Sequence, residues 1–453
     1  MPIPIILIHG YSDKGQSFLK WKQLLIATGK YTAADIHICS YRTLTNEVTI
    51  KDVAEGFDRA LRINTGISAD QPFDAIVHST GMLVLRSWLT VFGRHQRLKH
   101  IIALAPASFG SPLAHKGRSW IGSIFKGSRE LGPDFLEAGD LVLDGLELGS
   151  RFTWDLAHKD LLGEDIFYGP TDKTPYVFTF CGNKQYGGLR GAVVGSPGTD
   201  GTVRWSGASL DTRKITLDFT KHKDDENRYR ITDWPAHVRA NLAMPFIPVD
   251  GLNHASILEN PSAILVGFVM DALSVTSSSM YNDWIKDTLE KSAETIAGMQ
   301  DKYQQFLIKA ADERGDGIND YNLQLYKMGK GKDPENEHNW EPIKIDVHSY
   351  SSDNSYRCFH INLRDLLGDD IENLKLEFMA SSGTVLLGYF DYTSEDENIL
   401  QTTNHTTFTM DLSPLLKDAA VKFFYPFTTT LIEIILNREP LPFKSKNEIA
   451  WFL

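Results

Sequence analysis

The chain has 453 residues, of which 42% are apolar and 23% are charged, and its formal net charge is −12. A chain of this length is expected to form about two to three domains, and it can bury a core large enough to fold without disulfides or a structural metal. The acidic balance argues against nucleic-acid binding, which needs a basic surface, and against docking on anionic lipid by charge alone.

The negative charge is confined to one part of the chain. Residues 1–275 contain 29 basic and 29 acidic side chains, which leaves 17 basic and 29 acidic ones for residues 276–453. Such a change in surface charge is typical of two modules with different surfaces. The sequence therefore predicts a domain boundary near residue 275.

Cysteine usage and hydropathy favour a soluble protein with reduced thiols. Cys39, Cys181 and Cys358 stand far apart, and no pair has metal-ligand or redox spacing. The apolar run Ile3–Ile8 lacks a basic flank and is too short for a signal peptide, and no later run is long enough to span a membrane. We therefore expect a cytoplasmic protein, with export by a signal-less route as the alternative, and no metal ion.

Residues 1–275 alternate apolar runs with amphipathic stretches, which favours a mainly parallel sheet with crossover helices. The expected strands are short apolar runs: Ile3–Ile8, Asp35–Tyr41, Phe73–His78, His100–Ala105, Tyr176–Cys181 and Phe246–Val249. The expected helices have apolar residues at helical spacing: Ser17–Thr28, Lys51–Ile63, Met82–Phe92 and Ala263–Leu273. Residues 107–175 break this alternation, so we expect an insertion there that serves as a lid or binding loop.

A second pattern follows residue 275. Apolar residues near helical spacing predict one long helix over Ser279–Asp312, within a helical linker region of residues 276–338. Residues 339–453 contain short alternating runs, which favour an acidic, β-rich, sandwich-like domain. These runs are Ile343–His348, Arg357–Leu363, Leu374–Met379, Thr384–Tyr392, Thr406–Leu412, Val421–Tyr425 and Leu431–Asn437.

A serine stands at the apex of a predicted strand–turn–helix. The strand Phe73–His78 runs into Ser79-Thr80-Gly81 and then into a helix, so the turn exposes the Ser79 hydroxyl at the carboxyl edge of the sheet and directs a helix N-terminus at it. Val77 stands where the pattern Gly-x-Ser-x-Gly has its first glycine, whereas Gly81 matches the second. An ordinary strand–helix turn is the alternative.

The turn after the first predicted strand is a second candidate part of an active site. His9-Gly10-Tyr11 follows it, and a glycine there lets the backbone approach a substrate oxygen. The backbone amides of Tyr11 and Thr80 are candidates for a two-donor oxyanion hole, which stabilises negative charge on that oxygen. A plain glycine turn is the alternative.

A nucleophilic serine needs a base and an acid that orients the base. His254 lies between the last predicted strand and the closing helix, and Asp200 lies on a glycine-flanked turn after the strand that ends near Cys181. Asp250 is a second candidate acid, whereas the remaining loop histidines have the features of surface residues. The order Ser79, Asp200, His254 is that of α/β-hydrolase triads.

With these residues in place, residues 1–275 resemble an α/β-hydrolase of the lipase type, as in bacterial lipases and the lecithin–cholesterol acyltransferase and GPI inositol-deacylase groups. The segments that carry the resemblance are His9-Gly10, Leu104–Pro112, Thr199–Val203 and Asn253-His254. The resemblance implies an α/β-hydrolase fold, with Ser79 as nucleophile, Asp200 as acid and His254 as base, and no cofactor. Val77 departs from the family pattern, and residues 276–453 resemble no family that we recognise.

These expectations favour a serine esterase that cleaves acyl esters of lipids. His9, Gly10 and His78 are candidate substrate-binding residues, as are Trp120 and Phe125 in the insertion, where apolar residues can line an acyl pocket. Packing of the insertion onto the core is the alternative for these apolar residues. The sequence leaves two other functions open: an inactive scaffold that binds a protein partner through the C-terminal domain, and an acyltransferase. It also leaves open a peripheral contact with a membrane.

Overall fold

The computed structural model describes most of the chain: residues 2–10, 16–41, 47–114, 140–169, 173–187, 196–232, 244, 246–366, 371–392, 405–413, 424–441 and 449–450. The chain divides into two compact units, and each contains segments from both halves of the sequence. The first unit comprises residues 1–212, 233–300 and 427–429, and the second comprises residues 213–232, 301–426 and 430–453.

A parallel sheet forms the centre of the first unit. Its strands lie in the order β2-β1-β3-β4-β5-β8, and every neighbouring pair is parallel. The strands are β1 (Ile5–Ile8), β2 (Ile36–Cys39), β3 (Phe73–His78), β4 (Leu98–Leu104), β5 (Tyr176–Gly182) and β8 (Phe246–Val249). Because β1, β3 and β5 are buried along their whole length, their sequences are nearly continuous apolar runs. The predicted strands of this sheet are confirmed.

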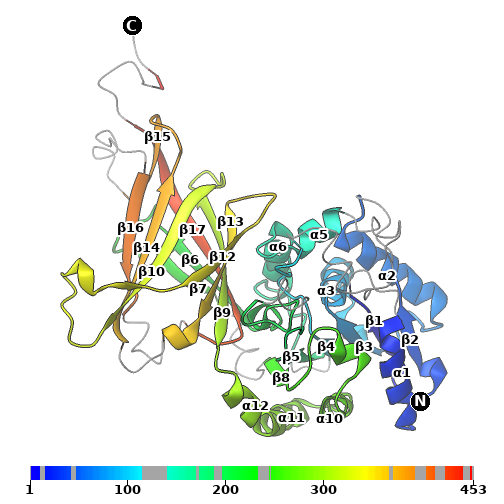
Figure 1. The fold of residues 1–453 in the computed structure, drawn as a ribbon. Helices are drawn as coiled ribbons and strands as arrows, with labels where there is room; N and C mark the ends of the chain where they lie inside the picture. The colour runs from blue at the N-terminus through cyan, green and yellow to red at the C-terminus, as the bar shows by residue number, and fades with distance from the viewer. Residues whose placement is uncertain are drawn as a thin grey trace. The chain divides into compact units, whose positions relative to one another are not determined.

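Helices cover both faces of this sheet, with α2, α3 and α6 on one face and α10 and α11 on the other (Figure 1). Their bounds are α1 (Leu19–Ala27), α2 (Ile50–Asn64), α3 (Gly81–Phe92), α5 (Asp140–Leu146), α6 (Arg151–Asp160), α9 (Ser256–Glu259), α10 (Ala263–Ala272), α11 (Ser278–Lys291) and α12 (Ala293–Gly298). Thr49 and Asp52 form a capping box that fixes the start of α2. Among the described residues, no helix has both the length and the hydropathy that crossing a membrane requires.

The long helix predicted over Ser279–Asp312 is wrong in its second half. Helix α11 ends at Lys291, α12 ends at Gly298, and strand β9 (Tyr303–Asp312) follows. Strand β9 is buried on both faces along most of its length. Its sequence, in which Gln304, Gln305 and Lys309 stand among apolar residues, does not alternate with the period of a half-buried strand, so the pattern does not distinguish it from a helix.

Two antiparallel sheets form the second unit. The smaller has the order β11-β10-β14-β16, and the larger has the order β12-β13-β9-β17-β6-β7, with β15 paired to β17. The strands that follow β9 are β10 (Asp320–Gly329), β11 (Glu341–Pro342), β12 (Ile345–Ser349), β13 (Tyr356–Asn362), β14 (Ile371–Ser381), β15 (Leu387–Phe390), β16 (His405–Asp411) and β17 (Thr429–Pro440). The hairpin of β6 (Thr212–Asp218) and β7 (Tyr229–Thr232) adds two strands from the first half of the chain.

Apolar side chains from both sheets of the second unit form one buried cluster. Phe306, Phe359 and Ile434 come from the larger sheet, and Leu323 and Phe378 come from the smaller one. A shared core between two antiparallel sheets is the arrangement of a β-sandwich. Six of the predicted strands of this region are present with shifted ends, whereas residues 421–423 of the predicted strand Val421–Tyr425 lie outside the described residues.

Candidate active site

Ser79 lies at a strained turn at the carboxyl end of β3. Its φ of 52° is in the left-handed region, which a residue with a side chain rarely adopts. The Ser79 amide donates to the carbonyl of Leu104 (3.3 Å), and the Ser79 carbonyl accepts from the amides of Met82 and Ala107 (both 3.1 Å). These three hydrogen bonds hold Ser79 between β3 and the first turn of α3, in the geometry of a nucleophile elbow.

Two glycines make this turn sterically possible. A Cβ added to Gly10 would lie 2.8 Å from Cβ of Ser79, and one added to Gly81 would lie 2.5 Å from the carbonyl oxygen of Ile8. Both distances are shorter than a carbon atom tolerates. Gly10 therefore lets the segment after β1 approach Ser79, and Gly81 lets the start of α3 approach the end of β1, which explains both glycine motifs. Val77 is fully buried in β3 and pairs in register with Ile8 and Ala103.

Asp200 and His254 form a buried pair beyond the ends of β5 and β8. The His254 Nδ1 and the Asp200 Oδ2 are 2.8 Å apart, and neither side chain is exposed to solvent. A second hydrogen bond joins the two loops, because the His254 amide donates to the Asp200 carbonyl (3.0 Å). An imidazole held in this way by a carboxylate has a fixed orientation.

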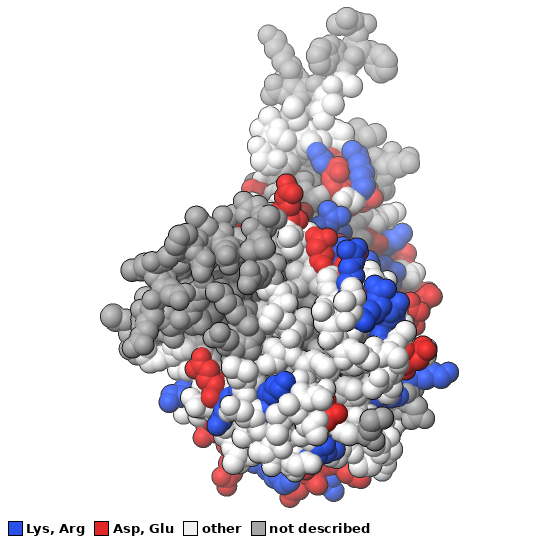
Figure 2. Space-filling model, turned by 90° about the vertical axis from the view of Figure 1, so that its right-hand side faces the viewer, with Lys and Arg blue, Asp and Glu red and all other residues white. Residues whose placement is uncertain are grey.

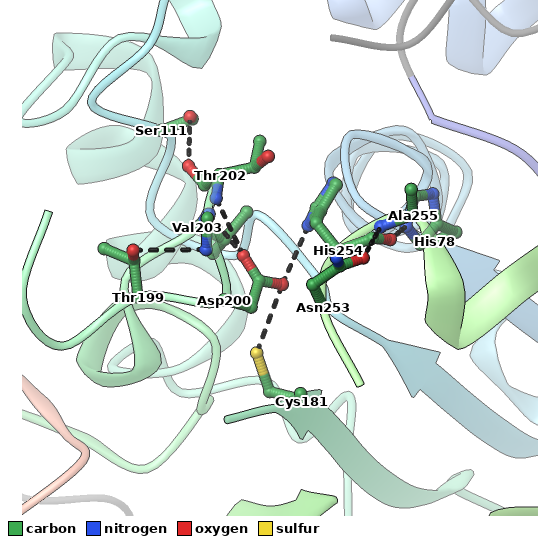
Figure 3. A network of polar contacts seen from close by, with 12 residues as sticks. His78, Ser111, Cys181, Thr199, Asp200, Thr202, Val203, Asn253, His254 and Ala255 are labelled. Atoms are coloured by element: carbon green, nitrogen blue, oxygen red, sulfur yellow. Dashed lines mark hydrogen bonds and ion pairs between the residues drawn. The ribbon is translucent and has the colours of Figure 1, made fainter. Parts of the chain in front are cut away.

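The turn that follows Asp200 fixes its carboxylate from the other side. The backbone amides of Thr202 (3.0 Å) and Val203 (2.8 Å) both donate to Oδ1 of Asp200 (Figure 3). The Ser111 hydroxyl donates to the Thr202 carbonyl (2.7 Å), so the segment after β4 supports the same turn. Asp250 is placed elsewhere, because it is exposed and its carboxylate accepts a hydrogen bond from the side chain of Asn183.

Cys181 is a further partner of Asp200 that the sequence did not identify. Its thiol donates to Oδ2 of Asp200 over 3.5 Å, from the end of β5 (Figure 3). Burial and the neighbouring Asp200 carboxylate raise the pKa of Cys181 well above its ordinary value. The thiol therefore stays protonated and remains a donor to the carboxylate.

The histidine that precedes Ser79 faces His254. The His78 ring is buried, its Nε2 lies 3.0 Å from the His254 carbonyl oxygen, and the centres of the two rings are 4.6 Å apart (Figure 3). Burial, together with the nearby His254 and His9, lowers the pKa of His78 well below 6.5. His78 is therefore neutral, and its Nε2–H donates to the backbone of His254.

The other predicted site residues have different placements. Thr80 is buried between Ser79 and the start of α3. The His9 ring is buried and stacks on Tyr41, with ring centres 4.5 Å apart. Three predicted residues lie outside the described part of the chain: Tyr11, Trp120 and Phe125.

The described part of the 107–175 insertion is fixed to the helix that follows Ser79. Arg86 of α3 makes two hydrogen bonds, of 2.7 and 2.8 Å, to the carboxylate of Asp160 in α6, and both side chains are completely buried. The Tyr168 hydroxyl donates to the same carboxylate (2.6 Å). This buried network anchors α6, while Val142, Leu143 and Leu146 of α5 are buried apolar residues.

The described residues also show how surface charge and candidate metal ligands are distributed. In Figure 2, residues of both charge signs lie along the bottom and the right-hand side of the visible face, and the middle of the described surface is mostly uncharged. Within the described residues, no group of three or more His, Cys, Asp or Glu side chains is arranged to hold a metal ion.

The parallel sheet, the elbow at Ser79 and the carboxyl-edge loops define the α/β-hydrolase fold, and the C-terminal β-sheets are added to it. No family model and no curated protein sequence matches the chain. Solved structures do match, and one of them is the phospholipase PlaB from Legionella pneumophila. It is 22% identical, covers 100% of this chain and 97% of its own, and gives a TM-score of 0.76.

Two further solved structures also match. A second PlaB structure, in complex with thio-NAD, is 22% identical over the same coverage with a TM-score of 0.74. The lipase BlEst2 from Bacillus licheniformis is 15% identical, covers 60% of this chain and 92% of its own, and has a TM-score of 0.37. The fold of the whole chain, including the C-terminal sheets, is therefore similar to that of PlaB.

Proposed function

We propose that the chain is a serine carboxylic-ester hydrolase that cleaves acyl esters of lipids. The observation that carries the proposal is the buried hydrogen bond between His254 and Asp200 at the same sheet edge as the strained Ser79 elbow. In this proposal Ser79 is the nucleophile, His254 the base and Asp200 the acid that orients the base.

The proposed reaction has two steps. Nε2 of His254 takes the hydroxyl proton while the oxygen of Ser79 attacks the ester carbonyl, and the backbone amides of Tyr11 and Thr80 stabilise the oxyanion. The tetrahedral intermediate then breaks its bond to the alcohol oxygen, which leaves with the proton from His254, and an acyl-enzyme remains. Water, deprotonated by His254, releases the acid and regenerates Ser79.

A lipid substrate is supported by the fold likeness to a phospholipase over the whole chain and by the apolar insertion. We propose that residues 107–175, with Trp120 and Phe125, contact the acyl chain, and that His9 and Gly10 line the approach to Ser79. Peripheral contact with a membrane and a protein partner at the β-rich region are part of the same proposal.

The decisive experiment treats the purified full chain with a fluorophosphonate probe, which forms a covalent bond with an activated serine. We expect labelling of the wild type that is absent in Ser79→Ala, with hydrolysis reduced on the order of 10⁶-fold. Absence of labelling in folded wild-type protein would contradict the proposal and favour an interaction protein on a hydrolase scaffold.

The substrate is tested with matched esters of short and long acyl chains and with phospholipid vesicles. Release of fatty acid from phospholipid supports the lipid proposal, whereas hydrolysis confined to water-soluble short esters contradicts it. Adding a long-chain alcohol separates the acyltransferase alternative, because a transferase forms the new ester in preference to free acid.

A further inference from the structure

Three residues near the C-terminus belong to the first unit, although the residues on either side of them belong to the second. These residues are Phe427–Thr429. Phe427 has a φ of 61°, in the left-handed region that a bulky side chain rarely adopts, and its side chain is buried. A strained conformation of this kind persists only where the surrounding contacts determine it.

The side chains of this segment contact the support of the Asp200 loop. The Phe427 ring packs edge-on against Trp205, with ring centres 6.3 Å apart, and the Thr429 hydroxyl donates to the Ser206 carbonyl (2.8 Å). Trp205 and Ser206 form the short helix that directly follows the turn carrying Asp200. The segment 427–429 therefore contacts two successive residues of the short helix that follows the Asp200 loop.

Trp205 in turn closes that loop. Its backbone amide donates to the Gly198 carbonyl (2.9 Å), two residues before Asp200, and its indole donates to the carbonyl of Gly182 at the end of β5 (3.0 Å). Both ends of the loop and the last residue of β5 thus meet at Trp205. A displacement of Trp205 would be transmitted to the amides that hold the Asp200 carboxylate.

The same Phe427 ring also contacts the strand that leads to His254. It stacks on Phe246, the first residue of β8, with ring centres 5.0 Å apart and planes inclined by 22°. The Phe427 ring therefore contacts Trp205, which follows the Asp200 loop, and Phe246, which begins the strand that precedes the His254 loop. Ordinary core packing needs a large apolar residue here, but it does not need a strained one.

We propose that Phe427 and Thr429 are positioning residues, which fix the Asp200 loop and the His254 loop relative to each other. They lie more than two hundred residues beyond Asp200 in the sequence. This inference rests on the catalytic roles proposed above. It implies that the catalytic unit is completed by the C-terminal part of the chain.

Two variants of Phe427 test the role of its ring. Phe427→Gly removes the ring and adopts a positive φ without strain, whereas Phe427→Tyr keeps the aromatic ring. We expect Phe427→Gly to lower kcat on the order of 10²-fold with KM nearly unchanged, because the base is misplaced while substrate contacts remain. Phe427→Tyr should retain kcat close to the wild-type value.

A spectroscopic readout makes the test independent of activity. A histidine Nδ1 proton bonded to a buried carboxylate gives a strongly downfield proton resonance, assigned here by its loss in His254→Gln. We expect this resonance to disappear or broaden in Phe427→Gly and to remain in Phe427→Tyr. Retention of both the resonance and kcat in folded Phe427→Gly overturns the inference.

The hydroxyl of Thr429 supplies a second, milder pair. Thr429→Val removes the donor to Ser206 at nearly constant volume, and Thr429→Ser keeps it. If Phe427→Gly does not fold, this pair decides: a resonance lost in Thr429→Val and kept in Thr429→Ser supports positioning, and equal behaviour of both contradicts it. If the wild type has no esterase activity, the proposed function fails, while the resonance still tests the positioning role.

Discussion

Two histidine–aspartate pairs are buried in the first unit, one at each end of the parallel strands. His254 and Asp200 lie beyond the carboxyl ends, with Nδ1 2.8 Å from the carboxylate. His100 and Asp74 lie near the amino ends of β4 and β3, with Nδ1 2.7 Å from the carboxylate. The two pairs have nearly the same length and burial, so neither property identifies an active site.

The surroundings of the two imidazoles differ. In the His100 pair, Nδ1 faces Asp74 and Nε2 lies 2.6 Å from the Val275 carbonyl oxygen, so both ring nitrogens have partners, one in β3 and one in the segment that follows α10. The His254 backbone instead contacts His78, the residue before Ser79. In the proposed reaction the base needs a nitrogen directed at the nucleophile, and Ser79, the proposed nucleophile, lies at the carboxyl edge of the sheet with His254.

Matched substitutions at the two histidines give the largest expected contrast. His254→Gln should lower kcat on the order of 10⁶-fold, since it removes the proposed base. His100→Gln should leave kcat near the wild-type value but lower the unfolding free energy by about 1–3 kcal/mol, because buried partners lose a hydrogen bond. Ester hydrolysis and thermal unfolding measure the two effects. A His100→Gln protein that is stable but inactive would contradict the comparison.

The sequence predicts one of these pairs and not the other for a physical reason. Asp200 and His254 stand on loops after strands, and Asp200 is flanked by glycines, so their position in the sequence points to a role other than strand packing. Asp74 and His100 stand inside apolar strands, and their contact depends on the register of β3 and β4, which the pattern does not contain. Phe427 gave no signal either, because its partners Trp205 and Phe246 are distant in sequence.

The aspartates provide a second, smaller contrast. Asp200→Asn keeps the shape of the side chain but presents an amide to His254, so the imidazole is held in the wrong tautomer, and kcat should fall by about 10⁴-fold. Asp74→Asn should change thermal stability with kcat unaffected. Steady-state kinetics on both folded variants checks this. Equal losses of kcat would mean that the two pairs act through one structural effect.

The smallest effect concerns stability and pH, where the two ends of the sheet should respond in opposite directions. The unfolded chain binds a proton at His78 near pH 6.5, whereas the folded protein binds it only at lower pH, because burial lowers the pKa of His78. Below pH 6.5 the unfolded state binds more protons, so stability falls as the pH falls, by up to about 1.4 kcal/mol per pH unit.

Asp74 has the reverse sign. Burial raises its pKa above 3.8, although the hydrogen bond from His100 opposes the shift, so the folded state keeps a proton that the unfolded state has released. The stability that this proton supplies is lost as the pH rises through the folded pKa. We therefore expect His78→Gln to reduce the fall of the unfolding midpoint toward low pH. Asp74→Asn should reduce the fall of the unfolding midpoint that accompanies rising pH. If His78→Gln leaves the acid side unchanged, His78 is charged in the folded protein, and its role as a neutral donor to the His254 backbone is wrong.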